Sequence, residues 1–192
     1  MKPIAQGKHI YIRSVCDDDF SFLYSIFNDT EELYLWSNYR DAQSFSQFEL
    51  LLKDMLKNVY RHFYIVCENE KCRKIGFLYC YNAHMNDGYV YTTAFVIEEY
   101  RKTLCGAEAG LLYYAHLFRY YNYRKIYSEV YSYNEESKCF LESAGFEIEG
   151  ILKKHRYYLD DFYDLYIFSI NRDFFFKKYD KLIEHFLNAI KE

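Results

Sequence analysis

Proline is nearly missing from this chain, whose 192 residues include one proline and seven glycines. Collagen-like repeats and glycine- or proline-rich linkers are excluded, because their composition depends on these two residues. No apolar run is long enough to span a bilayer, and the first six residues contain no apolar signal-peptide core. We therefore expect one cytoplasmic domain without a membrane partner.

Cysteine pairs with metal-ligand spacing are also missing. None of the six cysteines forms a Cys-x-x-Cys motif, and no paired histidines accompany them. A zinc site needs such spacing, so we expect no metal. In a reducing compartment we expect free thiols at the six positions, which are Cys16, Cys67, Cys72, Cys80, Cys105 and Cys139.

The chain lacks an excess of positive charge as well, since its formal net charge is −4. Nucleic-acid binding depends on basic surfaces, so we expect no nucleic-acid partner. Hydrophobic residues make up 51% and charged residues 27%, which is typical of a globular chain rather than a disordered one. The 24 tyrosines and 17 phenylalanines indicate that aromatic residues fill sheet and core positions.

One stretch in the middle of the chain combines a strand, a basic loop and a helix. Residues 89–97 are rich in β-branched and aromatic residues, and Arg101, Lys102 and Gly106 follow them. The helix is predicted by an apolar stripe of Leu104, Ala107, Leu111, Ala115 and Phe118. Free N–H groups at the start of a helix bind anions, and a glycine there allows close backbone approach. The stretch therefore predicts a site for a diphosphate.

This stretch fits neither of two common nucleotide-binding motifs. The chain has no Gly-Lys-Ser/Thr for a P-loop, and it lacks the three spaced glycines of a dinucleotide fingerprint. Residues 96–109 instead resemble the acetyl-CoA pyrophosphate loop of the GNAT family of N-acetyltransferases, with Leu104 at its first glycine position and Gly106 at its second. Residues 134–150 are similar to the family's Asn-x-x-Ser…Gly-Phe…Glu-Gly signature. Residues 157–166 look like the terminal hairpin of the ribosomal-protein and spermidine acetyltransferase branch.

The resemblance covers about residues 8–172 and implies an α+β (α/β) fold. The implied domain, residues 1–192, has a mixed, mostly antiparallel twisted sheet of about seven strands flanked by helices. An extra helix is expected at about 173–191. Acetyl-CoA is the implied cosubstrate, with its pantetheine arm between the strands at 89–97 and 125–132. The residues implied to bind it are Phe95, Val96, Arg101, Lys102, Thr103, Leu104, Cys105, Gly106, Ala107, Asn134 and Ser137.

Alternation and helical spacing predict the remaining elements. Further strands are expected at residues 9–15, 63–68, 74–81, 125–132, 151–159 and 162–171. Helices are expected after the N-cap candidates Asp17, Asp18 and Asp19, after Ser44, and at 137–144 before the C′ residue Gly145. Gly76, inside a strand, predicts a bulge or a close backbone approach.

Acetyl transfer to an amine needs a neutral amine, a polarised carbonyl and a proton for the departing thiolate. The resemblance implies direct attack of the amine and a backbone N–H near Val96 that polarises the carbonyl. Leu141 stands where many family members carry the tyrosine that protonates the thiolate, so the resemblance implies Ser137 as the donor. Ser137 fits equally well as the N-cap of a short helix, and Asn134 fits a turn as well as it fits a ligand of the pantetheine arm.

The residue that accepts the amine's proton is harder to identify. Tyr91 stands at the position of the family's common glutamate, and a tyrosine is a poor base near neutral pH. His155, on the strand after Glu149 and Gly150, is a candidate acceptor, directly or through water. Glu32 and His84, in loops expected to face the acceptor, are further candidates and expected substrate-binding residues.

Three functions are compatible with these features. The leading one is an N-acetyltransferase for a primary amine, such as a protein N-terminus, a polyamine, an amino sugar or an aminoglycoside. The departures at Leu104, Tyr91 and Leu141 favour, as the alternative, a catalytically degenerate domain that binds or senses acyl-CoA. A nucleic-acid or peptide-binding module is the third, and the acidic balance disfavours it. The sequence leaves both a monomer and a homodimer open.

Overall fold

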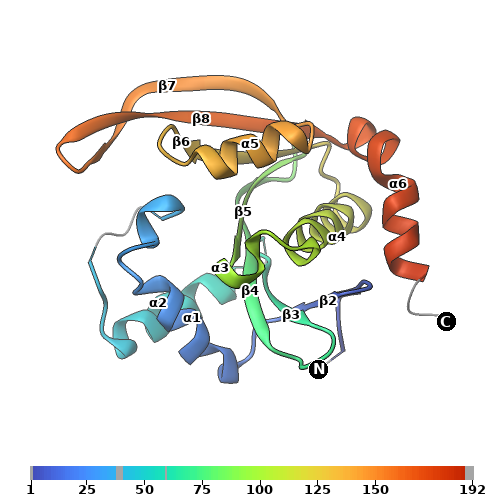
Figure 1. Cartoon of the computed structure of the whole chain (residues 1–192), viewed down its shortest axis with the longest axis horizontal. Coiled ribbons are helices and arrows are strands. Elements are labelled where there is room, and N and C mark those ends of the chain that lie inside the picture. Colours follow the sequence, from blue (N-terminus) through green and yellow to red (C-terminus); the bar gives the residue numbers. More distant parts are fainter. Residues whose placement is uncertain (1, 38–40, 59, 189–192) are drawn as a thin grey trace.

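The computed structural model describes residues 2–37, 41–58 and 60–188 (Figure 1). The strands are β1 (Ala5–Gln6), β2 (Ile10–Ser14), β3 (Phe63–Glu68), β4 (Lys74–His84), β5 (Tyr89–Val96), β6 (Lys125–Tyr131), β7 (Glu147–Tyr158) and β8 (Asp161–Asn171). The α-helices are α1 (Phe20–Phe27), α2 (Phe45–Lys57), α3 (Glu98–Arg101), α4 (Leu104–Tyr120), α5 (Glu135–Ser143) and α6 (Arg172–Asn188). Two short 3-10 helices are η1 (Asp17–Asp19) and η2 (Leu33–Leu35).

The strands form one open, mixed sheet in the order β1-β2-β3-β4-β5-β6-β8-β7. Neighbouring strands are antiparallel except β5 and β6, which are parallel because α4 connects them. The predicted mixed, mostly antiparallel sheet is therefore confirmed, with eight strands in place of about seven. The additional strand is β1, whose two residues are too few for any sequence pattern to reveal.

The pairing between β5 and β6 stops early. It comprises three rungs, which join Tyr89 to Lys125, Val90 to Ile126 and Tyr91 to Tyr127. The Thr92 hydroxyl then donates to the Tyr127 carbonyl at 3.2 Å, and the strands diverge beyond this bond. The C-terminal halves of both strands therefore leave a gap in the middle of the sheet.

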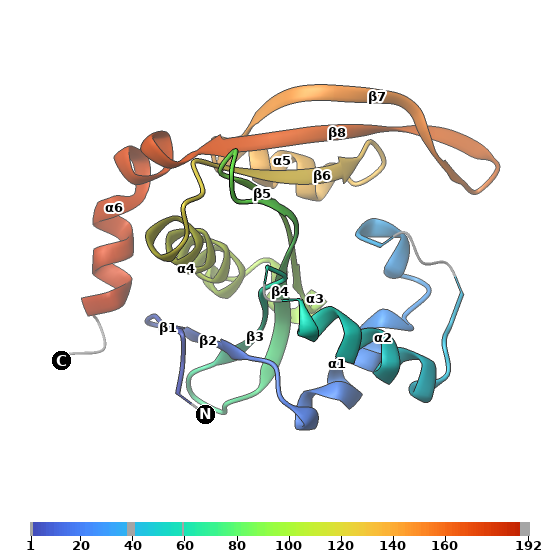
Figure 2. The same ribbon diagram turned by 180° about the vertical axis from the view of Figure 1, so that it is seen from behind.

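Helices cover the two faces of the sheet with separate cores (Figures 1 and 2). On one face α4 packs against β2, β4, β5 and β6, with α5 and α6 beside it. On the other face α1 and α2 pack against β3, β4 and the end of β5. The predicted C-terminal helix is confirmed from Arg172 to Asn188, and the predicted position Ile190 lies outside the described residues.

Several local signals act as predicted. Ser44 caps α2, and Gln47 completes a capping box. Gly145 follows α5 with a φ of +85°, the left-handed conformation that favours glycine at C′. Gly76 marks a close approach, because a Cβ there would lie 2.1 Å from the carbonyl oxygen of Phe95. Short β-strand and helix signals of this kind therefore place the elements within a few residues of their true ends.

Three predictions of local structure differ from what the structure shows. Asp19 stands at the N-cap position of α1 but its side chain forms no capping hydrogen bond, because the buried carboxylate accepts hydrogen bonds from Arg13 at 2.6 and 2.7 Å and pairs with Lys74 at 2.9 Å. Leu104 does not join the buried stripe of α4, since it is 64% exposed where the helix begins at the surface. The loop expected at residues 82–88 also starts later, because β4 continues to His84.

In the described part of the chain, no helix combines the length and apolar character needed to cross a bilayer.

Candidate active site

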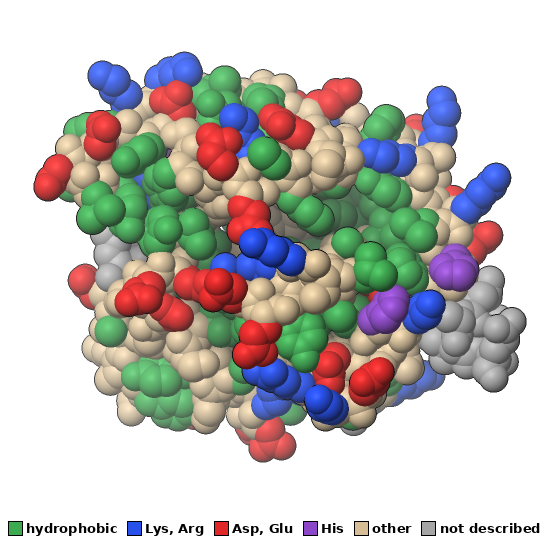
Figure 3. Space-filling model, in the orientation of Figure 1, with side chains coloured by type: hydrophobic (Ala, Val, Ile, Leu, Met, Phe, Trp, Pro, Cys, Tyr) green, Lys and Arg blue, Asp and Glu red, His purple; other side chains and the backbone are tan. Residues whose placement is uncertain are grey.

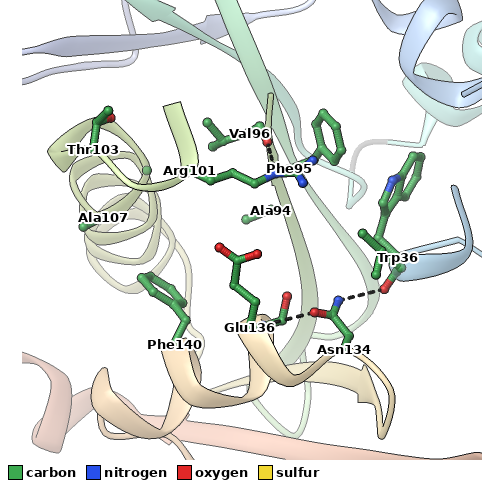
Figure 4. A pocket seen from close by; sticks show the side chains of 13 residues that line it. Trp36, Ala94, Phe95, Val96, Arg101, Thr103, Ala107, Asn134, Glu136 and Phe140 are labelled. Carbon is green, nitrogen blue, oxygen red and sulfur yellow. Dashed lines mark hydrogen bonds between the residues drawn. The ribbon is translucent and has the colours of Figure 1, made fainter. Parts of the chain in front are cut away.

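A pocket of about 220 Å³ lies among the end of β5, the start of α4, the first turns of α5 and the end of η2. Figure 3 shows a hollow in the middle of this face of the molecule, with apolar side chains on its walls. The residues that line the pocket are Leu35, Trp36, Ala94, Phe95, Val96, Arg101, Thr103, Gly106, Ala107, Asn134, Glu136, Ser137 and Phe140 (Figure 4).

The start of α4 supplies backbone donors to this pocket. Thr103 is the N-cap, and its hydroxyl accepts from the N–H of Cys105 at 3.2 Å. Gly106, the third residue of the helix, lines the pocket with an N–H group that no carbonyl of this helix can reach. Ala107 lines the pocket beside it. A Cβ on Gly106 would meet no protein atom closer than 3.8 Å, so internal packing does not require glycine here. An anion bound at this turn would explain the glycine, because the anion must approach the backbone N–H groups closely and a side chain would block it.

The first turn of α5 forms the opposite wall. Asn134 is the N-cap of α5, because its Oδ1 accepts from the N–H of Ser137 at 3.1 Å. Its Nδ2 donates to the carbonyl of Leu35 at 3.2 Å and so ties α5 to η2. The interpretation of Ser137 as the N-cap is therefore wrong, since Ser137 is the third residue of the helix and lines the pocket.

Arg101 closes one edge of the pocket with its charge already paired. Its Nη2 donates to Glu32 Oε2 at 2.6 Å, and its Nε donates to the carbonyl of Val96 at 2.9 Å. The guanidinium also lies over the Phe95 ring, 5.3 Å from its centroid. The structure thus brings the predicted cosubstrate residue Arg101 and the predicted substrate residue Glu32 together, and any anion at Arg101 competes with Glu32.

The far end of the pocket is aromatic. Trp36 packs edge-on against Phe27 and Phe77, with ring centroids 4.9 and 5.2 Å apart. Its indole N–H is buried without a hydrogen-bond partner among the described residues. The pocket therefore runs from the polar start of α4 to an apolar end that carries one unused donor.

The family follows from one comparison. The family model of the acetyltransferase (GNAT) domain matches residues 12–167 of this chain. The chain belongs to the GNAT acetyltransferases. The resemblance seen in the three sequence motifs is thereby confirmed for the family as a whole.

Solved structures of acetyltransferases share the fold. Spermidine N-acetyltransferase from Vibrio cholerae, in complex with CoA and spermine, superposes with a TM-score of 0.74 at 18% identity, covering 86% of this chain and 97% of that one. RimL, a ribosomal L7/L12 alpha-N-protein acetyltransferase in complex with coenzyme A, gives 0.79 at 14% identity, covering 90% and 99%. A putative acetyltransferase from T. thermophilus gives 0.75 at 18% identity, covering 96% and 98%. A search of curated protein sequences found no match.

The acetyltransferase pocket contains most of the residues expected to bind the cosubstrate. The residues that line it as expected are Phe95, Val96, Arg101, Thr103, Gly106, Ala107, Asn134 and Ser137. Lys102, Leu104 and Cys105 do not line the pocket, and the N–H of Cys105 donates to the Thr103 hydroxyl. The roles of all these residues in binding remain predictions.

Two residues proposed for the chemistry are not brought to the pocket. His155 is exposed on β7, whereas its neighbour Arg156 is buried and donates to the carbonyl of Ser37 at 2.9 Å. His84 is exposed at the end of β4, where it pairs with Asp87 at 2.8 Å. It lies beside Tyr89, at the opposite end of β5 from the pocket. The geometry gives neither histidine a place in the lining.

Sequence reasoning missed several residues of the lining. Glu136 and Phe140, four residues apart on α5, project into the pocket (Figure 4). The available signal was helical spacing, because Phe140 lies three residues after Ser137 and four after Glu136. Leu35 and Trp36 come from a segment distant in sequence, which no local pattern connects to this pocket. Among the described residues, no group of three or more His, Cys, Asp and Glu side chains is placed to hold a metal ion.

Proposed function

We propose that this acetyltransferase moves the acetyl group of acetyl-CoA to a primary amine by direct attack in a ternary complex. The observation that carries the proposal is the gap between β5 and β6, which begins after Tyr91 and Tyr127 and lies beside the first turn of α4. A gap in a sheet exposes strand N–H and C=O groups to an extended arm such as pantetheine. The free N–H group of Gly106 and the positive end of the α4 dipole fit the diphosphate at the other end of that arm.

In this proposal the neutral nitrogen of the amine attacks the thioester carbonyl carbon. The C–N bond forms, the carbonyl oxygen takes the negative charge, and the C–S bond breaks as the carbonyl reforms. The amine nitrogen loses a proton to water, the departing thiolate gains one from its donor, and that donor regains a proton from water. Ser137, which lines the pocket from α5, is the proposed donor to the thiolate. Asn134 holds Ser137 in place, because the Asn134 side chain accepts a hydrogen bond from the backbone N–H of Ser137.

The relatives support an amine acceptor of this kind. The Vibrio cholerae enzyme is a spermidine N-acetyltransferase, and RimL acetylates the α-amino group of a ribosomal protein. Polyamines and protein N-termini are therefore the first acceptors to test, followed by amino sugars and aminoglycosides. We expect a cytoplasmic enzyme, as a monomer or homodimer, that needs no metal.

Turnover with a panel of these amines tests the proposal, with acetylated product measured by mass spectrometry. Thiol reagents are unsuitable, because this chain carries six cysteines that are free in the structure. We expect product with at least one amine and a fall in kcat of about 10- to 100-fold in Ser137→Ala, with unchanged affinity for acetyl-CoA. Acetyl-CoA binding without product from any amine would favour the catalytically degenerate alternative.

A further inference from the structure

The sheet face opposite α4 carries a set of tyrosines beside the gap. Cys80, Val90 and Ile126 face α4 and are buried, so the residues that follow them, Tyr81, Tyr91 and Tyr127, face the other way. Their rings form a continuous row, since Tyr81 and Tyr91 lie 5.6 Å apart and Tyr91 and Tyr127 lie 4.9 Å apart. We call these three residues the tyrosine row.

One ammonium is already held on this face by the protein itself. Lys125 pairs with the carboxylate of Glu149, and its Nζ lies 5.5 Å from the centroid of the Tyr127 ring. The Tyr127 hydroxyl donates to the same carboxylate at 3.0 Å. A carboxylate, a tyrosine hydroxyl and a tyrosine ring thus form a site that an alkylammonium fills.

A second carboxylate, tyrosine hydroxyl and tyrosine ring lie at the other end of the tyrosine row, and no lysine pairs with them among the described residues. The Tyr81 hydroxyl donates to Glu129 Oε2 at 2.9 Å, and the Tyr91 ring lies beside Tyr81. Glu129 is exposed, and within the described residues its carboxylate forms no ion pair. Burial, together with the charge of Glu129, raises the pKa of Tyr81, so its hydroxyl remains a donor at every physiological pH.

The position of Glu129 relates this second site to the gap. Glu129 lies two residues beyond Tyr127, which belongs to the last rung between β5 and β6. At about 3.3 Å per residue it stands about 7 Å past the point where the strands part. Ala94, which lines the pocket from the other strand, lies three residues past the same point, or about 10 Å. Glu129 therefore borders the gap at the same level as the pocket, on the sheet face away from α4.

We infer that Glu129 and Tyr81 bind a positively charged amine of the acceptor at the edge of this gap. The inference rests on the proposed function, and it specifies the acceptor as an aliphatic amine that is protonated at neutral pH. Arylamines, which are uncharged there, are not acceptors for this site. Glu129 selects the acceptor by its charge. The neighbouring site, where Lys125 pairs with Glu149 over the Tyr127 ring, shows how this surface binds an ammonium.

Calorimetric titration with 1,4-diaminobutane tests the inference, with the protein both free and saturated with CoA. We expect Glu129→Gln to weaken diamine binding at least 10-fold and to leave CoA binding unchanged. Tyr81→Phe keeps the ring and removes the hydroxyl, so we expect a smaller loss of about 2- to 5-fold. The control is Glu147→Gln, which removes an exposed carboxylate at the start of β7 and is expected to leave diamine affinity unchanged.

The readouts separate failure of the inference from failure of the proposed function. A wild-type protein that binds no diamine, or binds it equally well after Glu129→Gln, would overturn the inference even if the enzyme acetylates some other amine. Absence of CoA binding would instead count against the proposed function, and diamine binding to the free protein would still decide the site. For an active enzyme, we expect Glu129→Gln to raise KM for the diamine at least 10-fold and to change kcat by less than 3-fold.

Discussion

Two residues of opposite charge line the pocket, Arg101 from the end of α3 and Glu136 from the first turn of α5. Figure 4 shows the Glu136 carboxylate pointing into the pocket, toward the wall that carries Arg101. The positive charge of Arg101 is paired with Glu32 at 2.6 Å, so the pocket has little net attraction for an anion apart from the start of α4. We therefore expect the affinity for acetyl-CoA to depend on backbone N–H groups more than on side-chain charge.

Removing the charge of Glu136 is expected to strengthen acetyl-CoA binding. Glu136→Gln eliminates the repulsion between this carboxylate and the diphosphate. Solvent and salt partly screen this repulsion, because Glu136 is exposed. We expect Kd to fall about 2- to 5-fold in 50 mM salt and the difference to disappear near 0.5 M salt. Calorimetry at the two salt concentrations measures it.

Glu135→Gln is the matched control for this prediction. Glu135 is the preceding residue, pairs with Lys138 at 3.6 Å and does not line the pocket. Equal gains in the two variants would mean that a general reduction in negative charge is responsible. Weaker binding in Glu136→Gln would contradict the assigned orientation of Glu136.

The start of α5 shows how far the sequence predicts the role of a single side chain. Asn134 and Ser137 were both recognised as important, but Ser137 was the predicted cap of the short helix and Asn134 was interpreted as a turn residue or a ligand of the pantetheine arm. The difference depends on where the helix begins, and boundaries shift easily by one or two residues. The hydrogen bond from the N–H of Ser137 to Asn134 decides it.

At the scale of elements, α4 carries a histidine that its packing keeps neutral. Burial, with a smaller contribution from the charge of the neighbouring His62, lowers the pKa of His116 to about 4. His116 Nδ1 is buried without a hydrogen-bond partner among the described residues, and the rings of Tyr64, Tyr120 and Tyr121 surround it. The unfolded chain has no such environment, so its histidine takes up a proton near pH 6.5.

This difference makes the folded state sensitive to acid. Between about pH 6.5 and pH 4 the unfolded state binds a proton that folded His116 does not, so the free energy of unfolding falls as the pH falls. We expect His116 to account for a loss of up to about 3 kcal/mol over this range, and His116→Gln to flatten the curve. Urea denaturation at several pH values measures it.

His185→Gln serves as the control, because His185 is exposed on α6. We expect the free energy of unfolding of this variant to change with pH in the same way as that of the wild type. A His116→Gln protein that loses stability with acid as steeply as the wild type would show that the folded state does not keep His116 neutral.

Secondary-structure elements were predictable where a short sequence pattern determines them. They were not predictable where strand pairing in the sheet determines which side chains are buried. The strand at residues 63–68 follows from its own composition and is confirmed as Phe63–Glu68. On β7 the pairing shifts between Leu152 and Arg156, and Lys154 adopts a φ of +51°. This irregularity changes which side chains face inward, so Arg156 is buried and His155 is not. Alternation in the sequence gives no sign of it.

At the scale of the whole molecule, the site exists because the chain leaves one gap in an otherwise continuous sheet. The parallel pairing of β5 and β6 ends after three rungs, and α4, α5 and η2 surround the opening. The family resemblance pointed to this place, because it implied a pantetheine arm between the strands at 89–97 and 125–132, which are the two that part here. The contribution of Leu35 and Trp36 was not predictable, since tertiary contacts alone bring η2 to the opening.

The central claim is that the first turn of α4 holds the diphosphate of acetyl-CoA. Calorimetric titration of acetyl-CoA into the wild type, Gly106→Ala and Gly106→Tyr tests it most directly. A Cβ on Gly106 would meet no protein atom closer than 3.8 Å, so we expect Gly106→Ala to fold with a thermal midpoint close to that of the wild type. Thermal melting also checks that Gly106→Tyr is folded before its affinity is compared. A bulky side chain on this turn, by contrast, occupies the space in front of its N–H groups.

We predict micromolar binding in the wild type, about a 3- to 10-fold loss in Gly106→Ala, and no measurable binding in Gly106→Tyr. Equal affinity in the folded wild type and folded Gly106→Tyr would contradict the claim, because the diphosphate would then have to bind elsewhere. Absence of binding in the wild type would contradict the enzymatic account as a whole.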